Sequence, residues 1–236
     1  MEKEWRLINF QVSDAYTNMA IDEAIFVIRE KLSLSPTIRF YSWQPPAISI
    51  GYFQKANDPL LNKYKIKKII FVRRFTGGGA ILHKDEMTYS LTCSLRYFPF
   101  LKDAIKAQMV IHQAIVLGLN NIGINAKLSG EKAELNSYFC FVKPTSFDVV
   151  KEKKKIAGSA QRRKNKSFFQ HGSILLNNEV LPRSIDKKET VKSLILGFEE
   201  KLKIKVFPGE LTKEEIDLSE ELRERKYAKD EWNYRR

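Results

Sequence analysis

Residues 67–95 read KKIIFVRRFTGGGAILHKDEMTYSLTCSL and contain the strongest strand pattern of the chain. A β-branched run leads into three consecutive glycines, Gly77, Gly78 and Gly79, and a short apolar segment follows them. From Met87 to Leu95, apolar and hydroxyl-bearing residues alternate strictly, which is typical of a strand with one apolar face. The stretch therefore predicts three strands, at 67–75, 80–83 and 87–95.

Helices and further strands are expected on both sides of this stretch. A helix is predicted at 16–31, with Asp14 as its N-cap, and another at 103–121, because each range places apolar residues on one helical face. Closing helices are predicted at 189–202 and 212–229. Further strands are expected at 6–10 as a sheet edge, 37–43, 47–53, 126–128, 138–142, 147–150, 155–160 and 167–176.

This order of elements predicts an α+β fold with mixed, largely antiparallel sheets and packed helices. The chain carries no internal repeat or flexible linker that would divide it. We predict a catalytic domain over residues 1–210 and a charged C-terminal helical tail over residues 211–236, packed on or extending the same domain.

Length and composition exclude several classes of protein. The chain has 236 residues, 43% of them hydrophobic, and two cysteines, which excludes a disordered tail and a disulfide-stapled miniprotein. The N-terminal residues MEKEWRLINF do not form a signal peptide, and the apolar runs are too short to span a bilayer. We expect a cytoplasmic protein without a membrane partner.

The positive charge is concentrated in two segments. The chain has a net charge of +13; residues 62–74 contain six basic residues and no acid, and residues 151–166 contain eight basic residues and one acid. Lysine-rich sheet edges that stay in solvent would explain both segments. A docking face for an acidic partner would explain them as well, and the neighbouring glycine motifs favour this second interpretation.

The glycine motif is the first candidate for a binding site. Three glycines flanked by Arg74 and Thr76 let the backbone approach a ligand without a Cβ in the way, whereas an ordinary bend needs fewer. The motif is neither a P-loop nor a GxGxxG fingerprint. It is compatible with a phosphate, a thioester carbonyl or an acyl chain as the ligand.

The two cysteines differ in their surroundings. Cys93 lies on the apolar face of its strand and is predicted to be a packed small hydrophobe. Cys140 precedes a cationic segment that would favour its thiolate, although a structural cysteine fits as well. Lys155 begins a strand that runs into a small-residue turn, and alternation places Lys155 and Ala157 on one face. It is either a solvated lysine or a proton-transferring partner of a thiolate or carbonyl.

The three histidines have no metal-ligand spacing, and the chain lacks CxxC and HExxH patterns, so no metal site is expected. His112 is predicted to be structural. His83 and His171 border the glycine-bearing motifs, where either could donate hydrogen bonds or fill the core.

Four stretches together resemble the lipoate-assembly branch of the biotin/lipoate protein ligase superfamily. They are NMAIDEAI (18–25), RRFTGGGAILH (73–83), KIAGSAQRR (155–163) and QHGSILL (170–176). The resemblance implies that Cys140 and Lys155 are catalytic. It also implies a substrate-binding set made of Arg74, Thr76, Gly77, Gly78, Gly79, His83, Gly158, Ser159, Ala160 and His171.

The position of the cysteine indicates the subclass. ATP-dependent lipoate ligases of this branch typically have an Asn-Asp pair before the lysine strand, where this chain has Phe139-Cys140-Phe141 and then Asp148. The chain also ends soon after its last expected helices, so we expect no accessory domain of the kind that larger ligases carry. The chain thus resembles the cysteine-dependent octanoyltransferases, and GSAQRR with QHGSILL favours the enzyme that uses acyl carrier protein over its amidotransferase relative.

The resemblance implies octanoyl transfer from octanoyl-acyl carrier protein to a lysine of an acidic lipoyl domain or of the glycine cleavage H protein, through a thioester on Cys140. No cofactor and no ATP are expected, and nucleic acid is not an expected partner. Two alternatives stay open: an ATP-dependent lipoate–protein ligase, and a non-catalytic basic module that binds nucleic acid.

Overall fold

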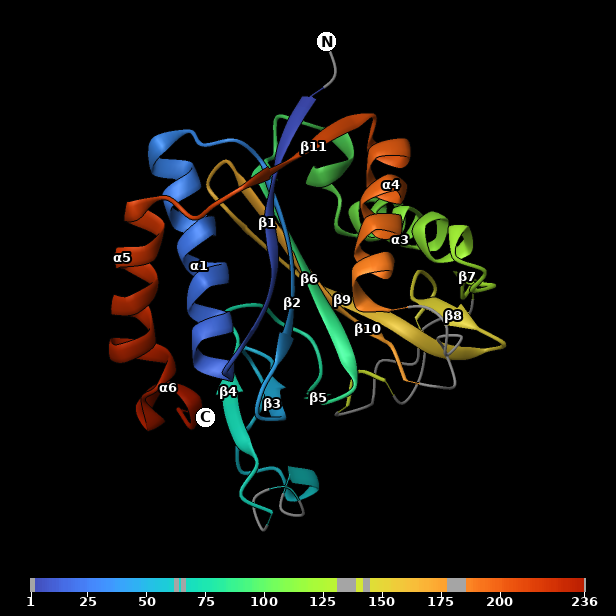
Figure 1. Ribbon diagram of the computed structural model, residues 1–236. Helices are drawn as coiled ribbons and strands as arrows, with labels where there is room; N and C mark the ends of the chain where they lie inside the picture. Colours follow the sequence, from blue (N-terminus) through green and yellow to red (C-terminus); the bar gives the residue numbers. More distant parts are fainter. Residues whose placement is uncertain are drawn as a thin grey trace.

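The computed structural model describes residues 3–61, 64, 67–130, 139–141, 145–177 and 186–235. Its larger sheet has eight strands in the order β11-β1-β2-β6-β10-β9-β8-β7 (Figure 1). These strands are β1 (Lys3–Ser13), β2 (Thr37–Trp43), β6 (Glu86–Ser94), β7 (Lys127–Leu128), β8 (Val149–Lys151), β9 (Lys154–Lys164), β10 (Ser167–Leu175) and β11 (Ile204–Gly209). A smaller sheet has the order β4-β3-β5, formed by β3 (Ala47–Ile50), β4 (Ile70–Arg73) and β5 (Ile81–His83).

Helices cover both faces of the larger sheet. The helices are α1 (Ala15–Leu32), α3 (Ala104–Asn121), α4 (Lys187–Leu202), α5 (Lys213–Leu222) and α6 (Asp230–Asn233). In Figure 1, α3 and α4 lie on one side of the sheet, and α1 with α5 outside it lies on the other. The smaller sheet lies beyond one end of α1. The arrangement confirms the predicted α+β fold with mixed, largely antiparallel sheets.

The alternation on β6 explains the main core. Met87, Tyr89, Leu91 and Cys93 point to the side of α3 and α4, where they pack with apolar residues of both helices. Burial excludes their apolar surface from water, which stabilises the sheet–helix layer. Asp14 caps α1 as predicted, since its carboxylate accepts hydrogen bonds from the backbone of Tyr16 and Thr17.

One prediction about the sheet is wrong. Residues 6–10 were expected to form an edge strand, but β1 lies inside the sheet because β11 pairs with it in parallel. The segment that forms β11 lies between two predicted helices and has only six residues, so its pattern did not indicate a strand. Most other differences are shifts of element ends; Ile105, expected near the core face of its helix, is exposed at the start of α3.

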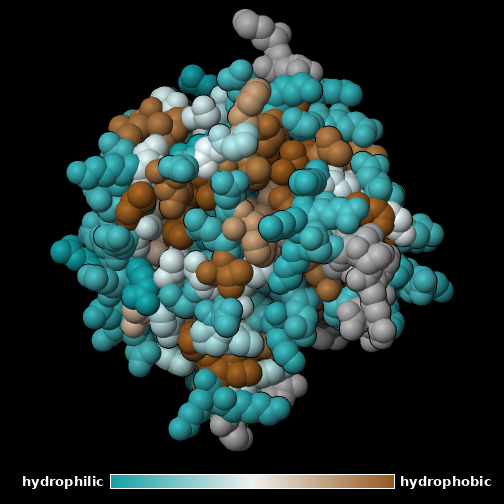
Figure 2. All heavy atoms as spheres, viewed as in Figure 1, coloured by the Kyte–Doolittle hydropathy of each residue, from teal (hydrophilic) through white to brown (hydrophobic). Residues whose placement is uncertain are grey.

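The C-terminal residues pack against the rest of the chain. Helix α5 lies along α1, and Tyr227 and Asn233 beyond it are buried. The division at residue 210 stays a prediction. On the face drawn in Figure 2, hydrophilic side chains surround the hydrophobic ones, which surface in patches. Among the described residues, no helix combines the length and apolar character that a membrane crossing requires.

Candidate active site

A pocket lies between the smaller sheet and the polar face of the larger one. Its volume is about 20 Å³, so the cavity is narrow in this structure. Its lining residues are Trp43, Ser49, Arg74, Gly78, Ile81, His83, Thr88, Cys140, Ser159, Ala160, His171, Gly172 and Ser173. The pocket therefore brings together six of the predicted binding residues and Cys140.

The glycine loop, residues 75–80, forms one wall of this pocket. Gly78 has φ of 89°, a left-handed conformation that favours glycine. A Cβ on Gly51 would lie 2.1 Å from the Gly78 carbonyl oxygen, so the loop after β3 packs directly on the glycine loop. The tight backbone packing explains glycine at position 51, and the left-handed φ explains glycine at position 78.

Arg74 holds the glycine loop from inside. Its guanidinium donates to the carbonyls of Gly77 and Gly79, at 2.8 and 2.7 Å, and to the Ser49 carbonyl at 3.1 Å. Burial lowers the pKa of Arg74 to about 10, and a Cys140 thiolate opposes that shift. Arg74 therefore keeps its charge at neutral pH and fixes the shape of the loop.

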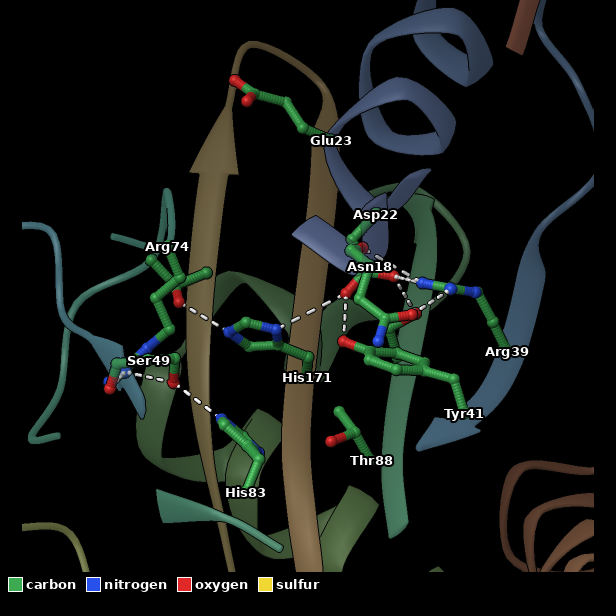
Figure 3. Close-up of polar contacts among 12 residues, drawn as sticks. Asn18, Asp22, Glu23, Arg39, Tyr41, Ser49, Arg74, His83, Thr88 and His171 are labelled. Carbon is green, nitrogen blue, oxygen red and sulfur yellow. Dashed lines mark hydrogen bonds and ion pairs between the residues drawn. The ribbon is translucent and has the colours of Figure 1, made fainter. Parts of the chain in front are cut away.

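His171 connects the glycine loop to α1. Its Nε2 lies 2.7 Å from the Thr76 hydroxyl, and its Nδ1 lies 3.5 Å from the Asp22 carboxylate (Figure 3). A carboxylate accepts only from a protonated nitrogen, so Nδ1 carries the hydrogen and Nε2 accepts from Thr76. Burial lowers the pKa of His171, although Asp22 opposes the shift, and the neutral form is favoured.

Asp22 itself is buried in a polar network. Its carboxylate pairs with Arg39 at 2.9 Å and accepts from the hydroxyls of Tyr41 and Ser90, at 2.7 and 2.9 Å. Arg39 and Asp22 are both fully buried. The network holds the imidazole of His171 in one orientation, which in turn fixes Thr76.

His83 closes the pocket at the end of β5. Its ring stacks on Trp43 with 3.8 Å between centroids. Glu86 lies 3.1 Å from its Nδ1, and Ser49 lies 2.8 Å from its Nε2. By the same argument as for His171, Nδ1 donates to Glu86 and Nε2 accepts from Ser49. Burial lowers the pKa of His83.

Cys140 and Lys155 meet at the pocket. The Lys155 Nζ lies 3.4 Å from the Cys140 Sγ and donates to the Cys140 carbonyl at 2.7 Å. Cys140 is half-buried and lines the pocket, whereas Cys93 is fully buried and burial raises the pKa of its thiol. The Cys140 backbone donates to the Ala80 carbonyl at 3.0 Å, so the end of the glycine loop positions the cysteine.

Asp148 is a functional candidate that the sequence reasoning missed. Its carboxylate pairs with Lys155 at 2.7 Å and is buried. It also accepts from the Thr145 backbone at 2.6 Å, which orients it toward the lysine. An acidic residue directly before the apolar start of β8 was the available signal, because a buried lysine needs a buried partner.

A bulge between β8 and β9 puts Lys155 into the site. Val149 pairs with Ala157 and Val150 with Lys155, which leaves Ile156 as an extra residue. Ala157 and Ile156 pack in the core on the α3 side, while the side chain of Lys155 lies over Gly158 on the opposite face. The prediction that Lys155 and Ala157 share a face is therefore wrong, because the bulge interrupts the alternation.

The room for Lys155 comes from Gly158. A Cβ at this position would lie 2.6 Å from the Lys155 Cε and 2.9 Å from its Nζ. Ser159 and Ala160 line the pocket farther along β9. Of the predicted strand at 138–142, Phe139 bridges to Ala80 and Cys140 and Phe141 form a turn; Tyr138 and Val142 lie outside the described residues.

The first cationic segment is only partly a surface. Arg73 and Arg74 are 0% and 2% exposed, so they cannot contact a partner as a docking face requires. Arg73 donates to the carbonyls of Gly51 and Gln54, at 3.0 and 2.7 Å, and to that of Asn233 at 3.1 Å. It thus joins the loop after β3 to the C-terminal segment. Lys67 and Lys68 in the first segment, and Lys153, Lys154, Lys164 and Lys166 in the second, are exposed.

His112 is buried on α3, where its Nδ1 hydrogen-bonds the Phe147 carbonyl, as expected for a structural residue. The described part of the chain holds no cluster of three or more histidine, cysteine, aspartate or glutamate side chains suited to a metal ion. Besides Asp148, the structure adds Trp43, Ser49, Thr88 and Ser173 to the site.

Known proteins are similar to this chain in sequence and in fold. Residues 14–227 match the family described as the lipoyl protein ligase A/B catalytic domain. The chain is 35% identical to the octanoyltransferase LipM of Brevibacillus brevis, with 99% of this chain and 100% of the relative covered. It is 37% identical to the octanoyltransferase LipM of Geobacillus kaustophilus, with 100% of both covered.

Solved structures give a related result. A putative lipoate protein ligase from T. acidophilum superimposes with a TM-score of 0.81 at 27% identity, over 100% of both chains. A lipoate-protein ligase A bound with ATP superimposes with a TM-score of 0.80 at 27% identity, over 99% of both chains.

Proposed function

The chain belongs to the lipoyl protein ligase A/B catalytic domain family and is an acyltransferase, and we propose that it moves an octanoyl group from octanoyl-acyl carrier protein to a lysine of lipoyl domains through a thioester on Cys140. Octanoyl transfer in lipoate biosynthesis agrees with the names of its full-length relatives. The single observation that carries the cysteine mechanism is the 3.4 Å distance between the Cys140 Sγ and the Lys155 Nζ.

In the first half-reaction, the Cys140 thiolate attacks the carbonyl carbon of the donor thioester. A new C–S bond forms to Cys140, the C–S bond to the donor's arm breaks, and the arm leaves as a thiol after Lys155 gives it a proton. The ammonium of Lys155 stabilises the thiolate before the attack. Exchange of one thioester for another is nearly balanced in free energy, so the step needs no ATP.

In the second half-reaction, the amine of the acceptor lysine attacks the octanoyl-enzyme. An amide bond forms, the bond to Cys140 breaks, and the neutral Lys155 takes the proton that the amine loses. The enzyme returns to its thiolate and ammonium. Conversion of a thioester into an amide is downhill, which drives turnover.

The proposed partners are octanoyl-acyl carrier protein as donor and acidic lipoyl domains or the glycine cleavage H protein as acceptors. The exposed lysines of β9 and its turns would attract such acidic proteins and raise their association rates at low salt. We propose that the enzyme works in the cytoplasm without a bound cofactor.

Intact-mass measurement after mixing with octanoyl-acyl carrier protein tests the thioester directly. The wild-type chain should gain one octanoyl group, and hydroxylamine should remove it. Cys140→Ala should show no gain. Cys93→Ala is the matched control, because Cys93 is buried in the core away from the pocket, and it should be acylated like the wild type. Acylation of Cys140→Ala at the wild-type rate would overturn the proposal.

An ATP-dependent ligase is a second candidate, since a solved structure with the same fold is a lipoate-protein ligase A bound with ATP. In that case Lys155 would hold an acyl-adenylate. The ligase predicts AMP release from free lipoate and ATP, with full activity in Cys140→Ala. The octanoyltransferase should release no AMP, and Cys140→Ala should abolish its activity.

A further inference from the structure

Two arginines lie at the rim of the glycine loop on the side away from Cys140. Arg162 on β9 donates to the Phe75 carbonyl at 2.6 Å, and its guanidinium carbon lies 5.5 Å from the centre of the Tyr52 ring. The guanidinium carbon of Arg235 lies 3.9 Å from the centre of the same ring. Both positive charges therefore lie around Tyr52, whose backbone donates to the Thr76 carbonyl at 2.8 Å.

Among the residues that the structure describes, no carboxylate pairs with either of these arginines. The adjacent Lys226, by contrast, pairs with Glu23 at 2.5 Å. Burial lowers the pKa of Lys226, Glu23 opposes this shift, and repulsion from Arg162 and Arg235 adds to it. Positive charges held together in this way are suited to an anion that arrives with a ligand.

The C-terminal segment holds Arg235 in place. The guanidinium stacks on Trp232 at 4.0 Å, and the Trp232 indole donates to the Arg73 carbonyl at 2.7 Å. Asn233 is buried and accepts from the Arg73 backbone at 2.8 Å. Arg73 also donates to the Tyr52 carbonyl, so one set of contacts fixes both the Tyr52 ring and Arg235.

The glycine loop connects this rim to the nucleophile. The loop runs alongside β9. Its Phe75 carbonyl accepts from Arg162, Gly78 packs against Ala160, and the Ala80 carbonyl accepts from the Cys140 backbone. Arg162 lies four positions after Gly158 on β9, which corresponds to about 13 Å of strand. Lys155 lies over Gly158 and next to the Cys140 sulfur, so the cations and the nucleophile lie at opposite ends of this path.

A phosphopantetheine arm matches the path in length and charge. It has about thirteen bonds between phosphorus and sulfur and, at the reach of an extended chain, spans about 15 Å. We propose that Arg162 and Arg235 bind the phosphodiester of the donor's phosphopantetheine arm while its thioester lies at Cys140; this site rests on the octanoyl transfer proposed above. Arginine suits the role, because its planar donors match phosphate oxygens.

Donors with and without phosphate test this site. Acylation of Cys140 is measured with octanoyl-pantetheine, octanoyl-4′-phosphopantetheine and octanoyl-acyl carrier protein. The wild type should prefer the two phosphorylated donors by at least about tenfold in kcat/KM, the usual effect of a hydrogen bond to a charged group. The double variant Arg162→Gln/Arg235→Gln should lose this preference because its KM for the phosphorylated donors rises. Its acylation rate with octanoyl-pantetheine should stay unchanged. The single variant Arg162→Lys keeps the positive charge and should therefore retain part of the preference for phosphorylated donors.

Arg163 provides the matched control. It follows Arg162 on β9 but points to the opposite face, where it donates to the Leu101 carbonyl at 2.7 Å and lies over Phe168. Arg163→Gln should keep the preference. Equal use of the donors by the wild type, an equal loss for all donors in the double variant, or a raised KM only for the acceptor would overturn the site. A chain that no donor acylates at Cys140 would instead overturn the proposed function.

Discussion

The two faces of β6 and β10 are equally buried but opposite in polarity. Toward α3 and α4, both strands present an apolar core that includes Tyr89, Cys93 and Ile174. Toward α1 and the smaller sheet, they present Thr88, His171 and other polar residues, which are also buried (Figure 3). The first face is explained mainly by packing, although Gln170 on it donates to the Tyr89 hydroxyl at 2.9 Å. The second is explained mainly by the hydrogen bonds that its residues form, although Phe169 on it packs against Phe26 and Phe75.

The difference shows where the chain places its chemistry. A buried polar group is costly unless it has a partner, so a polar buried face persists only with a complete network. Asp22 has three such partners besides His171, and Glu86 accepts from both Thr88 and His83. Both faces therefore contribute stability, but only the polar face also fixes the geometry of the pocket. Four experiments test this division.

The largest effect is expected for Lys155→Met on the polar side. The ammonium beside Cys140 is proposed to transfer protons, so its loss should slow acyl transfer by about 10²- to 10⁴-fold. Time-resolved intact mass with octanoyl-acyl carrier protein measures the rate. Lys164→Met, at the exposed end of the same strand, should stay within about twofold of wild type, as expected for a surface position. Equal slowing of acyl transfer in both variants would point to an effect of net charge and would contradict a specific role of Lys155.

Next is the buried pair of Arg39 and Asp22. Arg39→Met leaves an unpaired buried carboxylate and should lower the free energy of unfolding by about 3–5 kcal/mol. Ile111→Ala on the apolar side should cost about 2–5 kcal/mol through its cavity. Urea denaturation measures both. Under conditions where both variants remain folded, only Arg39→Met should also reduce acyl transfer, because Asp22 orients His171; full activity would contradict the proposed role of the network.

A smaller effect is expected for Gly158→Ala. The added Cβ would lie 2.6 Å from the Lys155 Cε, so the ammonium must move away from Cys140. We expect a loss of about tenfold in the acylation rate, the consequence of a misplaced catalytic group. Gly77→Ala is the control, because the nearest heavy atom to its Cβ is 4.0 Å away and its φ is not positive. A loss in Gly77→Ala as large as in Gly158→Ala would contradict this explanation.

The smallest effect is a dependence of stability on pH. Burial lowers the pKa of His83, His112 and His171, so the folded chain favours their neutral forms. Their contribution to stability is complete above the unfolded value of about 6.5 and decreases as the pH falls below it, since the unfolded chain then binds more protons. The urea midpoint should fall between pH 7.5 and 5.5. His171→Gln should reduce this fall; an unchanged slope would exclude His171 as a contributor.

Much of the fold was predictable because its patterns are local. The alternation of Met87 to Leu95 and the helical spacing after Asp14 describe elements that form as expected. Cys93 was assigned to the core by the same pattern, and it is buried there. The glycine motif, His83 and His171 were recognisable as site candidates, since polar and glycine residues next to apolar strands are unusual.

Local sequence patterns predict most of the helices and strands and the α+β class, and sequence motifs name most residues of the pocket. Three features depend on how distant segments pack: Lys155 faces the pocket, Asp148 pairs with it, and the C-terminal segment holds Arg73 and places Arg235 at the rim. Each depends on a pairing between segments far apart or on a single extra residue in a ladder. Side-chain periodicity encodes what one segment buries; it does not encode which distant segment lies against it.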